Sequence, residues 1–149
     1  MSARDGTIPP QQSSTFMPLS STQLDSTASF PCIQVDNLFD IANRLHEFPW
    51  KPFGDGVEIH RLYGDGVTGP TAALIHFIKN AQVPRHYHEG YEHILILAGS
   101  QTDQNGRIGA GALRIHPPGT SHSVMGEAGC VVLAVYEKAV TFFAAEKGS

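Results

Sequence analysis

Side chains of metal-binding type lie close together in one short stretch of this sequence. His86 and His88 are two residues apart, and in a β-strand that spacing places both imidazoles on the same face. A tight turn at residues 89–91 would then bring Glu92 back on a neighbouring strand, toward the two histidines. Two imidazoles and one carboxylate held on rigid strands suit a divalent transition metal.

A second stretch offers a fourth ligand. From Gly111 onward the sequence predicts a strand, then a Pro-Pro-Gly turn, and then His122 as it enters the next strand. We therefore expect His122 to join His86, His88 and Glu92 around one ion.

Together, the two stretches resemble the two motifs of the cupin family. The first motif, H-x-H-x3-E-x6-G, is matched from His86 to Gly99, and the second, G-x5-P-x-G-x2-H-x3-N, from Gly111 to His122. Gly126 replaces the final Asn of the second motif, which is not a metal ligand in the family. The resemblance implies an all-β, single-domain cupin double-stranded β-helix, or jelly-roll barrel. It also implies one divalent metal ion, with iron or zinc favoured and manganese or nickel left open.

One branch of the family fits especially well. Residues 50–137 are similar to ChrR-type cupins, named after the zinc-binding C-terminal half of an anti-sigma factor. The matching features are Trp50, residues 84–88, residues 97–100, residues 117–122, and the pair Gly129-Cys130. Anti-sigma factors of that kind carry an N-terminal helical domain with its own zinc site. Because the N-terminal residues here are polar, a sigma-binding role is not expected for this chain alone.

The resemblance leaves two classes of function open. Stand-alone members of the branch include iron dioxygenases that cleave carbon–carbon bonds, so the first is an iron-dependent dioxygenase acting on a small diketone or hydroxyketone. The second is a non-catalytic zinc-binding sensor or regulatory module. No Ser-His-Asp order and no glycine-rich phosphate loop is recognisable, so any reaction is expected to be carried out by the metal and a directly bound substrate.

Three further residues are candidates for lining the site. His76, on the strand before the first motif, is either a pocket residue or a buried structural histidine. Arg85 and Arg114 either clamp an anionic substrate or are solvated surface arginines. Tyr87 and His93 alternate with the ligands along their strands and are expected to point away.

Composition narrows the choice of partner and compartment. The 149 residues fit one domain with a sizeable core, and the net charge is −4 without a basic stripe, which argues against nucleic acid. No apolar stretch approaches the roughly 18 residues that span a membrane. No secretory signal is visible, and Cys32 and Cys130 fit buried, reduced thiols. We expect a cytoplasmic protein with a small-molecule substrate or ligand.

The chain is predicted to have three parts. Residues 1–30 form a polar N-terminal arm, residues 31–140 the cupin domain, and residues 141–149 a C-terminal tail that is either an outer strand or a frayed end. The arm is expected to pack on its own barrel or across a partner subunit. The cupin resemblance implies a homodimer.

Alternation and turn chemistry predict the elements of the domain. A short strand is expected over residues 30–35 and a helix from Asp36 to Leu45, ended by Pro49, Pro52 and Gly54. A two-residue hairpin turn is expected at Asn105-Gly106. Further strands are predicted over residues 57–63, 71–78, 92–97, 113–116, 121–125 and 130–136.

Overall fold

The computed structural model describes residues 31–144. Contacts divide the chain into two units, Met1–Cys32 and Ile33–Ser149, and all the elements below belong to the second. The predicted arm, residues 1–30, lies outside the described residues. Within residues 31–144, no helix is long and apolar enough to cross a membrane.

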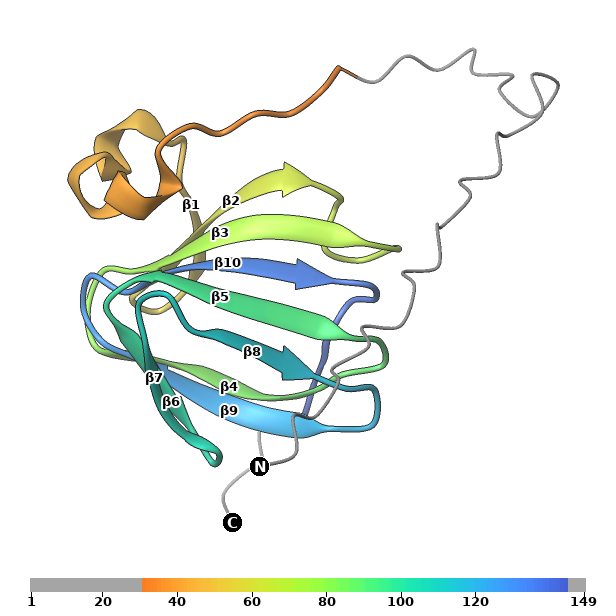
Figure 1. Cartoon of the computed structure of the whole chain (residues 1–149). Coiled ribbons are helices and arrows are strands. Elements are labelled where there is room, and N and C mark those ends of the chain that lie inside the picture. The colour runs from red at the N-terminus through yellow and green to blue at the C-terminus, as the bar shows by residue number, and fades with distance from the viewer. Residues whose placement is uncertain (1–30, 145–149) are drawn as a thin grey trace, which may run out of the picture. The chain divides into compact units, whose positions relative to one another are not determined.

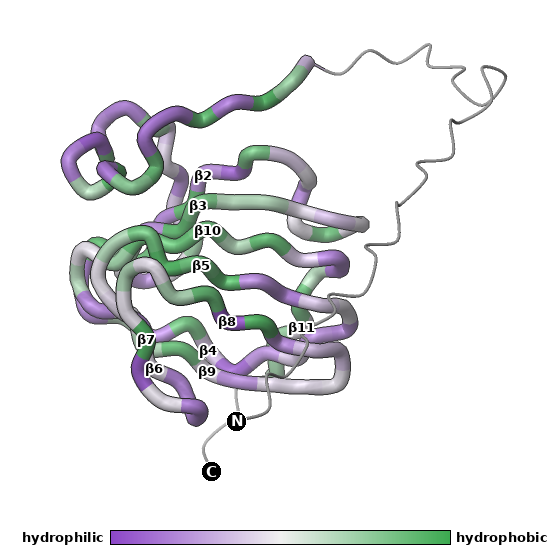
Figure 2. The backbone as a smooth tube through the Cα atoms, viewed as in Figure 1, coloured by the Kyte–Doolittle hydropathy of each residue, from purple (hydrophilic) through white to green (hydrophobic). Residues whose placement is uncertain are grey.

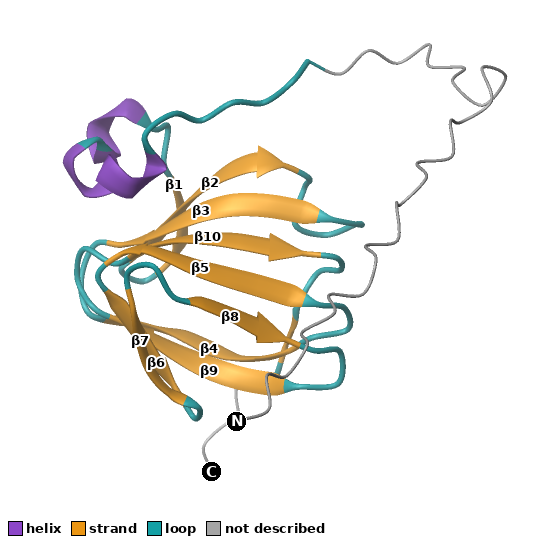
Figure 3. Cartoon of the chain, viewed as in Figure 1, coloured by secondary structure: helices purple, strands orange, loops and turns teal. Residues whose placement is uncertain are grey.

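Two antiparallel sheets make up the domain (Figure 1). The six-stranded sheet has the order β1 (Lys51–Gly54), β2 (Val57–Tyr63), β3 (Thr71–Phe77), β10 (Val131–Tyr136), β5 (Glu92–Ala98), β8 (Leu113–His116). The five-stranded sheet has the order β11 (Thr141–Phe142), β4 (Ala81–Tyr87), β9 (Ser121–Gly126), β6 (Ser100–Asp103), β7 (Gly106–Gly109). Strands dominate the described chain (Figure 3), which confirms the predicted all-β class.

The main core lies between the sheets. Phe77, Ile96 and Val132 from the six-stranded sheet are buried there with Ala81 from β4. Hydrophobic stretches run along β10 and β5, in the middle of the larger sheet (Figure 2). Their side chains alternate between this core and a second cluster on the other face of the same sheet, as a sheet covered on both faces requires.

The residues before β1 cover that second face. The structure has no strand at residues 31–35, so the strand predicted there is wrong. The predicted helix is replaced by two 3₁₀ segments, η2 (Leu38–Asn43) and η3 (Leu45–Glu47), with no side-chain cap at either start. Ile41 from η2 is fully buried in the second cluster. Trp50 packs there as well, and its Nε1 donates a hydrogen bond to the Leu45 carbonyl over 2.7 Å.

Six predicted strands are confirmed as β2, β3, β5, β8, β9 and β10, with ends that shift by at most one residue. Sequence reasoning missed β1 because it contains Pro52, which is tolerated in an edge strand. The hairpin turn is shifted by one residue from its predicted place. Asp103 pairs with Gly106 across it, so Gln104 and Asn105 are the central residues.

The two cysteines have different environments. Cys130 is buried, and burial raises the pKa of its thiol to about 12. Cys32 is exposed, so the expectation that both thiols are buried is wrong for this residue.

At the C-terminal end of the domain, β11 takes up the first residues of the predicted tail and pairs with β4 as an outer strand.

Candidate metal centre

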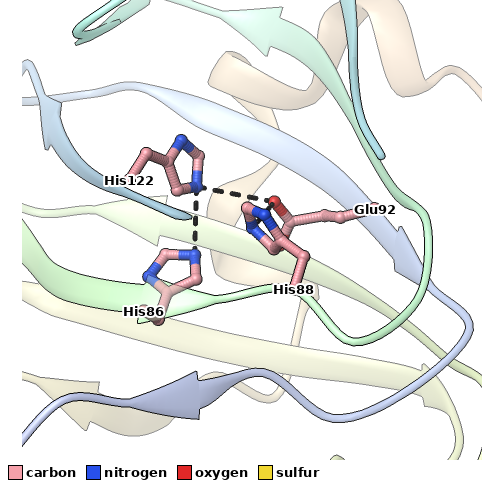
Figure 4. Close-up of side chains that lie close together, drawn as sticks. All are labelled: His86, His88, Glu92 and His122. Atoms are coloured by element: carbon pink, nitrogen blue, oxygen red, sulfur yellow. Dashed lines mark hydrogen bonds and ion pairs between the residues drawn. The ribbon is translucent and has the colours of Figure 1, made fainter. Parts of the chain in front are cut away.

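Four buried side chains from both sheets point toward one spot inside the barrel (Figure 4). His86 lies on β4, His88 directly follows that strand, and His122 lies on β9 as the register partner of His86. Glu92 begins β5, which belongs to the other sheet. The prediction that Glu92 lies on a strand neighbouring β4 is therefore wrong. The turn at residues 89–91 crosses between the sheets, so the group is held from two sides.

The potential ligand atoms are close enough to share one cation. The Nε2 atoms of His86 and His122 are 3.0 Å apart, and Nε2 of His88 is 3.0 Å from Oε2 of Glu92. The same Glu92 oxygen is 3.6 Å from Nε2 of His122. One atom from each residue lies within 4.8 Å of the other three. Each side chain is less than a tenth exposed, so bulk water does not solvate these atoms.

Partners outside the group orient two of the imidazoles. Nδ1 of His86 donates a hydrogen bond to the Pro84 carbonyl over 2.9 Å. Nδ1 of His122 donates to Oδ2 of Asp103 over 3.0 Å. Both acceptors lack a proton to give, so each Nδ1 carries a hydrogen, and in the neutral ring each Nε2 presents its lone pair to the centre.

The tautomer of His88 follows from a short relay of hydrogen bonds. The Thr120 hydroxyl donates to the Pro117 carbonyl over 2.7 Å, so its oxygen is free to accept. Nδ1 of His88 lies 3.0 Å from that oxygen and therefore donates to it. In their neutral forms all three imidazoles thus turn an unprotonated Nε2 inward, which is the arrangement of metal-binding histidines.

Two inward atoms have no hydrogen-bond partner in the described part of the chain: Nε2 of His88 and Oε2 of Glu92. Leaving a buried polar atom unpaired costs about 1–3 kcal/mol. The lone pairs of His86 and His122 also face each other over 3.0 Å, which is repulsive without a cation or a proton between them. Three imidazoles and one carboxylate match the preferences of iron, zinc, manganese or nickel more closely than those of calcium or magnesium.

The charge of the group also favours a cation. Burial acts to raise the pKa of Glu92, but interactions with His122 and His88 outweigh it and hold the pKa below its ordinary value, so the carboxylate is ionised. Burial lowers the pKa of His86. Burial acts in the same direction on His122, but the carboxylates of Glu92 and Asp103 reverse it and raise the pKa of His122.

Sequence reasoning missed Asp103 and His116, which lie beside the group. The His116 ring stacks on His88 with centroids 5.0 Å apart and lies 4.1 Å from the ring of His122. Nε2 of His116 is 3.9 Å from Asp103, and these two residues form a second ligand-type group with His122. Burial lowers the pKa of His116 to about 4. Strand alternation, which puts Arg114 and His116 on one face of β8, is the signal that would have found it.

The structure places His76 away from the group. On β3, Ile75 and Phe77 face the cavity described below, and His76 between them faces the second core cluster. Its Nδ1 is 2.8 Å from Oε1 of Glu58, and its ring centroid is 5.5 Å from that of Trp50. These contacts match the structural alternative for His76.

The two candidate arginines differ in position. Arg85 is exposed, donates to the Ser121 hydroxyl over 3.0 Å, and lies over the ring of Phe143. Arg114 is closer to the group, because its Nη1 donates to Oδ1 of Asp103 over 2.8 Å. Arg114 therefore acts on the site through Asp103.

A cavity of about 60 Å³ adjoins the group between the two sheets. His86, Glu92 and His122 form one side of it. The other described residues of its lining are aliphatic or aromatic, except Gln101 from β6. A molecule in this cavity would touch the group directly.

A double-sheet barrel with an inward-facing group of three histidines and one glutamate defines this protein as a cupin. More narrowly, the chain belongs to the ChrR cupin-like domain family, whose model matches residues 39–140. The resemblance to ChrR-type cupins that the motifs indicate is thereby confirmed.

Known proteins show how far the likeness reaches. The anti-sigma-E factor ChrR of Cereibacter sphaeroides is 31% identical over 105 residues, which cover 68% of this chain and 48% of that protein. The chain thus spans about half the length of this relative. The crystal structure of Rhodobacter sphaeroides SigE in complex with the anti-sigma ChrR matches with a TM-score of 0.59 at 27% identity, covering 84% of this chain and 71% of that chain.

The fold also occurs in a protein described as an enzyme. A proposed acetylacetone dioxygenase of Methylibium petroleiphilum PM1 matches with a TM-score of 0.63 at 14% identity. The match covers 81% of this chain and 87% of that chain. A likeness at this identity shows the fold alone.

Proposed function

We propose that this chain is a regulatory cupin that binds one divalent metal ion through His86, His88, Glu92 and His122. The observation that carries this proposal is the orientation of the imidazoles, since every Nδ1 donates outward and every Nε2 faces the centre. The five-stranded sheet carries these imidazoles on and beside β4 and β9, and the outward hydrogen bonds fix their orientations. Zinc or iron fits the donor set, and either ion would act as a Lewis acid with positions left for a further ligand.

Sequence similarity to an anti-sigma factor supports the regulatory role. The relative at 31% identity is an anti-sigma factor, and a crystal structure holds it together with SigE. Because this chain spans about half of that protein, we extend to it a regulatory role and not the contact with a sigma factor.

A second candidate is an iron-dependent dioxygenase that cleaves a small diketone or hydroxyketone. The cavity favours it, because three of the four proposed ligands line the space in which a substrate would lie. In this case His86, His88, Glu92 and His122 would hold the iron, and the apolar walls would exclude water from the bound substrate.

Metal content and oxygen uptake separate the two candidates. Chelator-treated protein is reconstituted anaerobically with zinc or iron(II), dialysed, and assayed for bound metal and for oxygen uptake with β-diketones and hydroxyacetophenones. If the chain is a regulatory cupin, we expect one zinc ion per chain after dialysis and no oxygen uptake by the iron form. Oxygen uptake with any of these ketones would favour the dioxygenase instead.

Substitutions of the proposed ligands test whether these residues hold the metal. His88→Ala and His122→Ala are expected to lose the stoichiometric metal, and Glu92→Ala is expected to bind it more weakly. His46→Ala removes an exposed histidine of η3 and should keep one ion per chain. Retention of full metal content by both His88→Ala and His122→Ala would contradict the proposed site.

We also propose that the protein is a homodimer, as the family resemblance implies, and that it is cytoplasmic. Light scattering at micromolar concentration is the test of assembly. A mass of twice 16.1 kDa is expected, and a monomer would contradict the proposal.

A further inference from the structure

The cavity beside the four proposed ligands reaches the surface at two aromatic rings. Among its described lining residues, only Phe53 from β1 and Phe142 from β11 are exposed, at 39% and 46%. The other described residues of the lining are buried or half-buried. These two phenylalanines therefore mark the mouth of the cavity.

The mouth lies between the edges of the two sheets. β1 is an edge strand of the six-stranded sheet, and β11 is an edge strand of the five-stranded sheet. Because the two strands belong to separate sheets, no ladder of backbone hydrogen bonds joins them within residues 31–144. Side chains, and not strand pairing, close the barrel at this place.

A second, larger hollow of about 330 Å³ lies next to the same two rings. Phe53, Val83 and Phe142 line both this hollow and the cavity beside the ligands, so they form the partition between the two spaces. The rest of the larger hollow is mostly lined by exposed residues, which include Asp55 and Gln82. A molecule that comes from this hollow must pass between the three partition side chains to reach the ligand group.

The approach to the ligand group from β8 is much narrower. Nη1 of Arg114 donates to Oδ1 of Asp103 over 2.8 Å on that side, and the ring of His116 stacks on His88. The hollow lined by Asp103, Arg114 and His116 has a volume of about 10 Å³, which accommodates about one water molecule. In the described part of the chain, the mouth between β1 and β11 is therefore the wider way in.

Phe53 lies at an irregularity of its strand. Pro52 pairs with Glu58 and Gly54 pairs with Val57, so Phe53 between them has no register partner on β2. An extra residue of this kind disrupts the local pairing and redirects a side chain, and such bulges are frequent at the rims of barrels. The Phe53 ring can therefore turn without breaking the rest of the sheet.

Phe142 lies on a strand that few interactions hold in place. β11 has only two residues, Thr141 and Phe142, and both are exposed. Short edge elements with exposed backbone hydrogen bonds open at a small cost in free energy. Phe142 pairs with His86 of β4, and the two rings have centroids 5.5 Å apart. An outward shift of β11 would therefore uncover the side of the cavity that His86 lines.

We propose that Phe53 and Phe142 form a gate that controls which molecules reach the metal position and how fast. Slender or flat apolar molecules pass when the rings move apart. Strongly charged molecules are excluded, because passage between the rings would remove their water without replacing its hydrogen bonds. The inference rests on the proposed metal site, but it concerns the rate of access to the ion and not the strength with which the ion is held.

The test measures how fast two chelators remove cobalt(II) from the loaded protein, followed by the loss of its visible absorption. o-Phenanthroline is neutral and flat, so it can attack the ion through the mouth, whereas the highly charged EDTA captures only metal that has already dissociated. The proteins are the wild type, Phe53→Ala, Phe142→Ala and the control Phe143→Ala. Phe143 is also exposed, but its ring lies beside Arg85 and does not line the cavity.

We expect o-phenanthroline to remove cobalt at least about tenfold faster from Phe53→Ala and Phe142→Ala than from the wild type and Phe143→Ala, because access is then no longer gated. In the wild type this rate should level off as o-phenanthroline is increased. Removal by EDTA and the equilibrium affinity for cobalt should change by less than about twofold in Phe53→Ala, as for a substitution away from the ligands. Phe53→Ala also provides a second test if Phe142→Ala fails to fold, which its melting temperature would show.

Three results would overturn the inference. Equal rates of removal by o-phenanthroline from the wild type, Phe53→Ala and Phe142→Ala would show that the two rings do not control access. An equal acceleration with EDTA and with o-phenanthroline would mean that the substitutions loosen the site instead of opening a path to it. Failure of the wild type to bind cobalt would contradict the proposed function as well, whereas the first two results would leave the metal site intact.

Discussion

The Asp103 carboxylate accepts a hydrogen bond from Nδ1 of His122 over 3.0 Å. Its other oxygen accepts from Arg114 over 2.8 Å, so the arginine fixes the direction of the carboxylate. Burial acts to raise the pKa of Asp103, but the hydrogen bond with His122 and the charge of Arg114 hold that pKa below its ordinary value. An ionised Asp103 keeps the proton of His122 on Nδ1 and leaves Nε2 available to a metal.

We predict that Asp103→Asn weakens metal binding by about 10–100-fold, because an amide no longer fixes the tautomer of His122. Competition with a chromophoric chelator measures the affinity. Glu127→Gln is the control, since Glu127 pairs with Arg107 on the surface, away from the group. Equal metal affinity in Asp103→Asn and Glu127→Gln would show that the Asp103–His122 contact does not support the site.

The glycine that departs from the second cupin motif has a packing explanation. A Cβ on Gly126 would lie 2.3 Å from the ring of Phe77, which is itself fully buried. We predict that Gly126→Asn, which restores the motif, lowers the free energy of unfolding by about 1–3 kcal/mol through overpacking. Urea denaturation measures it.

A glycine with free space around it provides the control for that prediction. A Cβ on Gly109 would meet nothing closer than 3.8 Å, so Gly109→Asn should cost much less than Gly126→Asn. Equal losses in the two variants would mean that the contact with Phe77 is not the cause.

His116 gives the metal-free protein a dependence on pH. Its pKa is about 4 in the fold because burial disfavours the charged ring, whereas an unfolded histidine titrates near ~6.5. Between these values the unfolded chain binds more protons, so the free energy of unfolding falls as pH falls from about 6.5 toward 4. We predict a smaller fall in His116→Phe than in the wild type, measured by urea denaturation with a chelator present. Parallel curves for the two proteins would contradict this account.

Much of the fold could be predicted because it has a local signature. The central strands β3 and β10 are nearly continuous apolar runs bounded by turns, and such runs indicate buried strands from sequence alone. The 3₁₀ segments have no such pattern. They exist because the sheet face beneath Ile41 must be covered, which is a tertiary requirement.

The candidate site, like the fold, could be predicted from the sequence only in part. Motif spacing was sufficient to select the four residues that the structure brings together. Spacing could show that the chain turns back before Glu92, but not which sheet the returning strand joins. That choice depends on long-range pairing, such as Glu92 with Tyr136 of β10. Gln101 and Asp103 have no fixed spacing to the ligands, so only the folded barrel shows their place beside them.

Anomalous diffraction at the zinc edge, from crystals grown with zinc, tests the metal site most directly. The account predicts one anomalous peak per chain, bounded by Nε2 of His86, His88 and His122 and by the Glu92 carboxylate. Absence of that peak in crystals whose solution contains zinc, or a peak held instead by Asp103 and His116, would contradict it.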